Sequence, residues 1–319
     1  MPTVLLSAPY MLQFVERFVP VLEKYGLDVI LPEVHERLSE QEILAYAGLF
    51  DGTICGDDRY TADVLQKCLP RLKVISKWGT GIDSIDREAA TNLGIQIKNT
   101  PNAFTMPVAD SIMGYMLAFA RQQPWMDRAL RRGDWQKTLS RSLSECTLGV
   151  VGVGNVGKGV IRRAKGFGMK LLGNDITRIA PDFIVENRVE MVPLPDLLQC
   201  SDFVSVCCDL NPTSYHLINK NTLSYMQKDS VLINCARGQI VNEADLIAAL
   251  QAQQIAGVAL DVFEVEPLPQ DSPLLKMDNV MLAPHNSNSS PAAWERVHWN
   301  TIRNLLDGFG IPHEDINDR

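Results

Sequence analysis

Three polar side chains toward the end of the chain have the types that acid–base chemistry on an anion requires. Arg237 lies in the segment NCARG, Glu266 in DVFEVEP and His285 in APH. A guanidinium can hold a carboxylate or keto oxygen in a fork and stays charged throughout. An imidazole is the most frequent general acid near neutral pH. Together the three types predict proton transfer to or from a held anion.

Each of these residues follows a short apolar run with the composition of a buried strand. If the strands are parallel, their carboxyl ends meet at one sheet edge, where ligands bind in doubly wound folds. We expect Glu266 to accept a hydrogen bond from His285 and to raise its pKa, so that His285 can protonate a carbonyl oxygen. A structural salt bridge for Arg237 and a structural histidine are the alternatives. The other histidines have no comparable setting and are assigned no role: His35, His216, His298 and His313.

A glycine-rich segment, GVGNVG at 152–157, lies between a predicted strand and a predicted helix at 155–168. A bare GxGxxG is weak evidence, but in this context it is typical of dinucleotide binding. Gly152 allows the tight turn, Gly154 lets the backbone approach the pyrophosphate, and Gly157 permits close packing of helix on strand. Unpaired N–H groups at the helix N-terminus would bind the phosphate oxygens.

The acidic residue expected at the end of the next strand is Asp175, 18 residues after Gly157. Its carboxylate can accept hydrogen bonds from both ribose hydroxyls and would repel the additional phosphate of NADP. The sequence therefore favours NAD. Because Arg178 is nearby and could bind that phosphate, NADP stays an alternative cofactor. The structural alternative for Asp175 is that it caps the end of the strand.

Composition excludes several other classes of protein. The 319 residues, 46% of them hydrophobic, suffice for about two domains. A net charge of −8 without a block of Lys or Arg argues against nucleic acid or an anionic membrane surface as partner. The longest apolar stretch, 112–120, is far shorter than the roughly 18 residues that a spanning helix needs. Because the N-terminus also lacks the basic flank of a signal peptide, we expect a cytoplasmic protein.

The cysteine pattern predicts no metal site. The chain has seven cysteines, an odd number, and they show no metal-ligand pair spacing. We interpret them as reduced core thiols, with a catalytic cysteine as the alternative. Several lie at or beside predicted buried strands: Cys55, Cys207, Cys208 and Cys235.

Short β-branched runs alternate with helical patterns, which predicts parallel strands with crossover helices. Before an apolar-faced segment at 107–121, the predicted strands are 3–6, 26–30, 52–55, 73–76 and 95–97. After it, they are 147–153, 170–174, 202–208, 230–235, 257–262 and 280–283. The predicted fold class is α/β with two doubly wound parallel-sheet units. Segment 124–146, rich in Arg and Trp, fits neither unit, which suggests an arm packed on a second subunit or an ordinary solvated helix and loop.

With these motifs in this order, the chain resembles the D-isomer-specific 2-hydroxyacid dehydrogenases, which include phosphoglycerate, D-lactate, formate and glycerate dehydrogenases. The matching segments are 151–175, 232–250, 257–267 and 282–285. The resemblance implies hydride transfer between NAD and C2 of a D-2-hydroxy acid or 2-keto acid, with a 3-phosphoglycerate-like acid among the candidates. The alternatives are oxidation of another small anion on the same scaffold and an NAD-sensing, corepressor-like binding protein.

The resemblance also implies the domain organisation. A Rossmann NAD-binding domain at 100–288 would be inserted into a flavodoxin-like substrate-binding domain formed by 1–99 and 289–319. Segment 107–145 would contain the interdomain helix and the dimer arm of a homodimer. No C-terminal regulatory domain is expected.

Roles follow from the family pattern residue by residue. Arg237 would bind the substrate carboxylate or keto oxygen, Glu266 would tune the acid, and His285 would transfer the proton. KWGTGID at 77–83 matches the substrate loop, whose backbone amides would form a nest for the carboxylate, although its glycines could be ordinary turn residues. The substrate-binding residues of this loop are Trp78, Gly79, Thr80 and Gly81. Cofactor contacts are implied for Asp261 at the nicotinamide carboxamide, Val108 near the nicotinamide ring, and Gly152, Gly154, Asn155, Val156, Gly157, Asp175 and Cys235.

Three departures from the family pattern concern the substrate. HNSNSS at 285–290 places polar side chains where the family often has an apolar residue and two small ones. In GDDRY, where phosphoglycerate enzymes tend to carry arginines, this chain has Asp57 and Asp58 with only Arg59. Trp78 is bulkier than usual and either shortens the pocket or packs beneath it. A phosphorylated substrate is therefore not assured.

Overall fold

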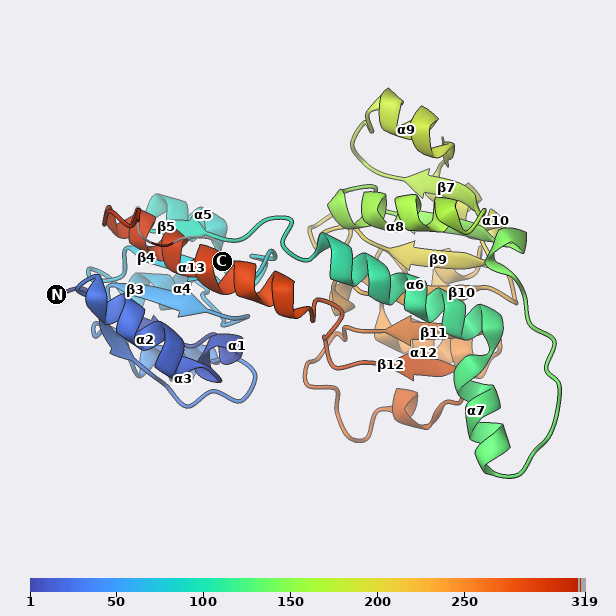
Figure 1. The fold of residues 1–319 in the computed structure, drawn as a ribbon, viewed down its shortest axis with the longest axis horizontal. Helices are drawn as coiled ribbons and strands as arrows, with labels where there is room; N and C mark the ends of the chain where they lie inside the picture. Colours follow the sequence, from blue (N-terminus) through green and yellow to red (C-terminus); the bar gives the residue numbers. More distant parts are fainter. Residues whose placement is uncertain (315, 317–319) are drawn as a thin grey trace. The chain divides into compact units, whose positions relative to one another are not determined.

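Contacts in the computed structural model divide the chain into two compact units (Figure 1). The first unit combines Met1–Phe104 with Ser290–Arg319, and the second is the continuous segment Thr105–Ser289. The two boundaries predicted from the sequence lie after residues 99 and 288. The structure describes residues 1–314 and 316. The end of the segment expected to complete the first unit lies outside these described residues.

The first unit is built on a five-stranded parallel sheet in the order β2-β1-β3-β4-β5. Its strands are β1 (Thr3–Leu6), β2 (Asp28–Ile30), β3 (Gly52–Cys55), β4 (Val74–Lys77) and β5 (Gln96–Lys98). β3 and β4 are buried along their whole length, as expected for strands covered on both faces. This strand order is the flavodoxin-like order, which confirms the predicted class for this unit.

The described helices of the first unit include one that returns from the far end of the chain. They are α1 (Pro9–Leu12), α2 (Val15–Lys24), α3 (Glu40–Leu44), α4 (Ala62–Lys67), α5 (Arg87–Asn92) and α13 (Pro291–Phe309). α13 packs on β3, β4 and β5 (Figure 1). It begins after Ser290, whose side chain caps it, and ends at Gly310 with a φ of 66°. A Cβ on Gly308 would lie 2.4 Å from the Val74 side chain, so glycine permits this close helix–sheet contact.

The second unit contains a seven-stranded sheet in the order β12-β11-β10-β9-β6-β7-β8, with all neighbours parallel. Its strands are β6 (Thr147–Val151), β7 (Lys170–Asn174), β8 (Val189–Met191), β9 (Phe203–Val206), β10 (Val231–Asn234), β11 (Gly257–Leu260) and β12 (Val280–Leu282). Counted within this unit, the order is 3-2-1-4-5-6 with one further strand, which is the Rossmann arrangement. The topological switch point therefore lies between β6 and β9.

The sequence pattern predicts every described strand of both sheets except β8. This strand has three residues, VEM, and pairs only with β7 at the sheet edge. A run this short shows no alternation long enough to distinguish a strand from a loop. Its pairing with β7 gives it strand geometry that its own sequence does not indicate.

The described helices of the second unit surround its sheet. They are α6 (Thr105–Arg121), α7 (Gln123–Arg131), α8 (Asn155–Gly166), α9 (Pro181–Asn187), α10 (Leu194–Cys200), α11 (Lys220–Leu223) and α12 (Glu243–Gln251). α6 covers the predicted apolar-faced segment, and it packs on α8 where Gly159 approaches Ala109. No helix within the described residues is long and apolar enough to cross a bilayer.

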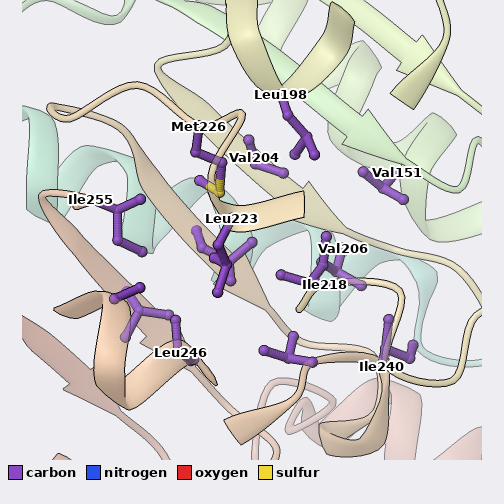
Figure 2. Close-up of a cluster of buried hydrophobic side chains, with 14 of the residues drawn as sticks. Val151, Leu198, Val204, Val206, Ile218, Leu223, Met226, Ile240, Leu246 and Ile255 are labelled. Carbon is purple, nitrogen blue, oxygen red and sulfur yellow. The ribbon is translucent and has the colours of Figure 1, made fainter. Parts of the chain in front are cut away.

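Figure 2 shows a buried apolar cluster that holds the strands of the second sheet in place. Val204 and Val206 from β9, Leu223 from α11 and Leu246 from α12 belong to this cluster and are fully buried. Burying such side chains contributes about 1.5–3 kcal/mol each. The cluster therefore fixes the positions at which the central strands end.

Candidate active site

The three polar residues follow three adjacent strands of the second sheet. β10, β11 and β12 are parallel neighbours, and their last residues pair side by side. Arg237 follows β10, Glu266 follows β11 and His285 follows β12, each within a few residues of the strand end. The parallel register therefore brings the three segments to one edge of the sheet, as the sequence analysis expected for doubly wound units.

His285 and Glu266 form a hydrogen-bonded pair. The imidazole Nδ1 lies 2.9 Å from the Glu266 Oε2, and both side chains are about one-fifth exposed, at 21% and 20%. Because an ionised carboxylate only accepts hydrogen bonds, Nδ1 is the donor in this contact. The other carboxylate oxygen, Oε1, accepts the Phe263 N–H at 2.9 Å. Glu266 is thus anchored to its own loop while it orients the ring.

Asp261 fixes the turn that carries His285. This fully buried carboxylate accepts the backbone N–H groups of Asn286 and Ser287, both at 2.9 Å. The His285 N–H donates to the Asp261 carbonyl at 2.7 Å, and His285 adopts a left-handed φ of 50°. A buried charge without such donors would be costly. The backbone contacts of Asp261 were not foreseen from the sequence, and its expected contact with a nicotinamide carboxamide remains a prediction.

The Arg237 loop packs directly against the Glu266 loop. The Asn234 side chain closes the turn by accepting the Ala236 N–H at 3.1 Å and donating to the Arg237 carbonyl at 2.9 Å. A Cβ on Gly238 would lie 1.9 Å from the carbonyl carbon of Phe263, so only glycine allows this contact. The half-buried guanidinium donates to the Ala236 carbonyl through one nitrogen at 2.9 Å.

The glycine motif has the geometry that a pyrophosphate site needs. Gly152 has a φ of 93°, and a Cβ there would lie 2.4 Å from the Cys208 backbone nitrogen. A Cβ on Gly157 would lie 2.1 Å from the Gly152 carbonyl oxygen, so the start of α8 sits tightly on the loop. Gly154 is exposed with open space above it, and no side chain caps the N-terminus of α8. Exposed amides without a side-chain cap fit a phosphate group.

Asp175 follows β7 and connects to the glycine loop. Its carboxylate accepts the Val153 N–H, the Thr177 N–H and the Thr177 hydroxyl, each at 2.7 Å. Desolvation acts to raise the pKa of Asp175, but the hydrogen bonds from Thr177 and Val153 and the charge of Lys158 together lower it. A carboxylate offers about four acceptor positions, so three are already used. Binding two ribose hydroxyls would require the Thr177 hydroxyl to turn away.

The other expected cofactor residues also belong to the second unit. Asn155, the first residue of α8, is exposed, and Val156 is half-buried. Cys235, directly after β10, is 9% exposed, and Val108 in α6 is 7% exposed. Their contacts with a cofactor remain predictions.

Three cysteine thiols beside the central strands are poor nucleophiles. All seven lie within the described residues and are free, but Cys200 is exposed at the end of α10, which corrects its interpretation as a core thiol. Burial raises the pKa of Cys207 to about 12 and that of Cys208 to about 11. Burial also raises the pKa of Cys235 well above its usual value. These three thiols therefore stay protonated at neutral pH.

The expected substrate loop follows β4 in the first unit. Gly79 has a φ of 121°, a conformation that favours glycine, and its carbonyl accepts the Thr100 N–H at 2.9 Å. The Thr80 hydroxyl donates to the Thr100 carbonyl at 3.0 Å. Thr80 is exposed and Gly81 is half-buried. The loop is thus tied to the segment after β5, and its role as a carboxylate nest remains a prediction.

A buried cation lies beside this loop and was missed from the sequence. The Lys77 side chain, 5% exposed, places Nζ 3.0 Å from the Trp78 carbonyl oxygen and 3.1 Å from Asp57 Oδ1. A Cβ built on Gly79 would lie 3.6 Å from that ammonium. The feature that could have indicated this cation is a lysine at the end of a strand whose residues are all buried.

Trp78 packs inside the first unit. It is 2% exposed, stacks on Tyr10 with a centroid separation of 4.4 Å, and donates its indole N–H to His298 Nδ1 at 2.9 Å. Of the two sequence-based alternatives, packing beneath the loop matches this position. Burial lowers the pKa of His298 to about 4, which keeps it a neutral acceptor.

One of the histidines without an assigned role has a partner that the sequence analysis did not expect. His216 Nε2 lies 2.5 Å from Glu264 Oε1, so the second unit contains a second histidine–glutamate pair. The two residues are far apart in sequence, and only the fold brings them together. The expectation that His216 has no comparable setting was therefore wrong.

The strand order and the glycine loop are typical of a Rossmann domain that binds a dinucleotide. A model described as "D-isomer specific 2-hydroxyacid dehydrogenase, NAD binding domain" matches residues 113–287. The chain belongs to the D-isomer-specific 2-hydroxyacid dehydrogenase family and is an NAD-dependent oxidoreductase.

Named relatives differ in substrate and length. A glyoxylate reductase of Korarchaeum cryptofilum is 40% identical over 255 residues, which cover 78% of this chain and 76% of that protein. A D-3-phosphoglycerate dehydrogenase of Methanocaldococcus jannaschii is 38% identical over 87% of this chain but only 52% of its own length. The chain therefore spans about half of the latter. The structure of D-lactate dehydrogenase from Aquifex aeolicus, complexed with NAD and lactic acid, superposes with a TM-score of 0.83 at 26% identity, covering 97% and 95% of the chains.

The open space above Gly154 gives a test of the cofactor site. Gly154→Ala should fold normally, because its backbone is extended and a Cβ meets nothing within 4 Å. If pyrophosphate lies over this position, the added methyl should weaken NADH binding by about tenfold or more, equivalent to about 1.4 kcal/mol. NADH fluorescence titration and thermal melting measure the two effects. Gly166→Ala, which also meets nothing within 4 Å, is the control. Equal NADH affinity in both variants would contradict this placement.

Proposed function

We propose that this enzyme interconverts a small 2-keto acid and the corresponding D-2-hydroxy acid, with His285 as proton donor and acceptor. The His285–Glu266 pair at the sheet edge that also carries Arg237 is the observation that supports the proposal most directly. These side chains are the acid, the group that orients it and the cation that such a reaction requires.

Each side chain has a separate task in the proposed reaction. Arg237 binds the substrate carboxylate or keto oxygen through its guanidinium fork. His285 holds a proton on Nε2 and passes it to the carbonyl oxygen, while Glu266 keeps the opposite nitrogen protonated and stabilises the charged ring. NADH, when bound over the glycine loop, supplies the hydride that C2 receives. In oxidation His285 takes the proton back.

Removing the imidazole tests the proton transfer. His285→Ala should lower kcat by about two to four orders of magnitude, the usual contribution of general acid catalysis. NADH affinity should be nearly unchanged, because the glycine loop and Asp175 are untouched. Stopped-flow or steady-state NADH absorbance measures turnover, and His35→Ala, on an exposed residue of the first unit, is the control. If turnover survives in His285→Ala, another group moves the proton.

For the substrate, we propose a small 2-keto acid with one negative charge, such as glyoxylate, in place of a phosphorylated acid. The ammonium of Lys77 beside Gly79 is already paired with Asp57, so it does not offer an unbalanced positive charge to a second anionic group. Asp58 is fully buried, accepting the Leu38 N–H at 2.7 Å and the Ser7 hydroxyl, and desolvation raises its pKa to about 6. The negative charges of Asp57 and Asp58 repel a phosphate group, which makes segment 56–60 unfavourable for a phosphorylated substrate.

A charge-removing variant tests this selectivity. Wild-type enzyme should prefer glyoxylate to phosphohydroxypyruvate, and Asp57→Asn should raise kcat/KM for the phosphorylated acid by about tenfold, or about 1.4 kcal/mol. Activity on glyoxylate should change little, because that substrate has no second anionic group. Asp63→Asn removes an exposed charge elsewhere in the same unit and is the control. A wild-type preference for phosphohydroxypyruvate would exclude the proposed selectivity.

We propose that residues 124–145 form the arm of a homodimer. α7 has no buried residue, and Trp135 and Leu139 are 84% and 97% exposed. Large apolar side chains this exposed are typical of a surface that another protein covers. The alternative of an ordinary solvated segment would leave both side chains in water.

Light scattering after gel filtration tests the arm. Wild-type protein should have twice the chain mass of 35.5 kDa, and the double variant Trp135→Asp with Leu139→Asp should have the mass of one chain. A dimer of the double variant would have to bury the two new aspartate charges without partners, which is costly. Val185→Asp changes an apolar residue that is 76% exposed outside the arm, so its mass should equal that of the wild type. An unchanged mass in the double variant would place the interface elsewhere.

A further inference from the structure

The second histidine–glutamate pair is built as specifically as the first. Because the Glu264 carboxylate accepts, His216 Nε2 is the donor at 2.5 Å, and the opposite nitrogen, Nδ1, is 3.4 Å from the Asn242 amide nitrogen, which can donate to it. The ring also stacks on Tyr215 with a centroid separation of 4.0 Å. Both ring nitrogens therefore lie within hydrogen-bond distance of a polar side chain.

Glu264 is held from several segments at once. Besides His216, its carboxylate accepts the Glu243 N–H at 3.2 Å, and its own N–H donates to the Glu243 carboxylate at 3.3 Å. The Gln239 side-chain amide donates to its carbonyl at 3.0 Å. These contacts join the loop after β11 to the start of α12 and to the segment that follows Arg237.

Glu264 lies in the same loop as Glu266, the carboxylate of the first pair. Phe263, the preceding residue, donates its N–H to Glu266 Oε1, and Gly238, next to Arg237, packs on the Phe263–Glu264 backbone. A shift of Glu264 would therefore move the carboxylate that orients His285 and loosen the contact with the Arg237 loop. His216 is joined to this network from its other side, because its N–H donates to the Gln239 carbonyl at 2.9 Å.

His216 adopts a backbone conformation that is uncommon for residues other than glycine. Its φ of 49° lies in the left-handed region, where a side chain with a Cβ is strained. The side chain is only 28% exposed. Such strain persists where the surroundings hold it, and it clusters at functional sites.

We propose that His216 and Glu264 are positioning residues that hold the Glu266 carboxylate and the Arg237 loop in their catalytic arrangement. This inference rests on the proposed function. His216 itself does not exchange protons with the substrate. Its hydrogen bond to Glu264 sets the geometry of the His285–Glu266 pair, so its loss affects the chemical step more than the binding of either ligand.

Matched substitutions at His216 separate positioning from general stability. His216→Leu should lower kcat about 10- to 100-fold, the effect expected of a misplacement near 1 Å. NADH affinity should stay within about twofold, since a factor of two is only about 0.4 kcal/mol. KM should rise by a smaller factor than that by which kcat falls. His216→Gln, whose amide can still donate to Glu264, should recover most of the lost kcat. His313→Leu disrupts a histidine–aspartate contact in the first unit and should leave kcat unchanged.

A double-mutant cycle with Glu266 shows whether the effect passes through that carboxylate. If it does, His216→Leu should lower kcat much less in a Glu266→Gln background than in the wild type. Glu264→Gln keeps the shape of the side chain and removes its charge. It should lower kcat without a comparable loss of thermal stability. This variant therefore still tests the proposal if His216→Leu folds poorly. Unchanged kcat in His216→Leu, or equal kcat losses in Leu and Gln variants, would overturn the positioning role. A wild-type enzyme inactive on every 2-keto acid would instead overturn the proposed function.

Discussion

The parallel register of β10, β11 and β12 is the constraint on which the candidate site depends. Because the three strands end side by side, the segments that follow them meet at one edge of the second sheet. Arg237, Glu266 and His285 follow three different strands, and the hydrogen bond between His285 and Glu266 joins two of these three loops. The buried apolar cluster beneath the sheet fixes this register, so core packing determines the geometry of the acid–base pair.

Three carboxylates at the candidate site and the glycine loop accept backbone N–H groups. Asp261 binds two N–H groups of the turn after β12, and Asp175 binds one from the glycine loop and one from its own turn. One carboxylate oxygen of Glu266 accepts a backbone N–H, and the other accepts a hydrogen bond from the His285 ring. Satisfying a buried carboxylate with fixed donors makes the turn rigid, which suits groups that must keep a defined geometry.

The negative net charge of the chain makes local positive groups decisive for binding anions. The exposed start of α8 offers backbone dipoles, Arg237 offers a guanidinium, and Lys77 offers an ammonium beside the loop at Gly79. Asp57, in the loop after β3, balances the charge of Lys77. Binding of an anionic ligand then depends on donors a few ångströms away, because more distant exposed charges are screened by salt.

The sequence by itself determined the α/β class, the glycine loop, nearly all strands and the candidate acid–base residues. These features depend on local patterns: apolar runs, glycine spacing and polar residues just after strands. Only the tertiary structure decided that β8 joins the sheet, that Asp261 holds the His285 turn, that Lys77 pairs with Asp57 and that His216 meets Glu264. Each of these contacts joins segments separated along the chain. Such partners are selected by strand register and loop packing, which no local run of residues specifies.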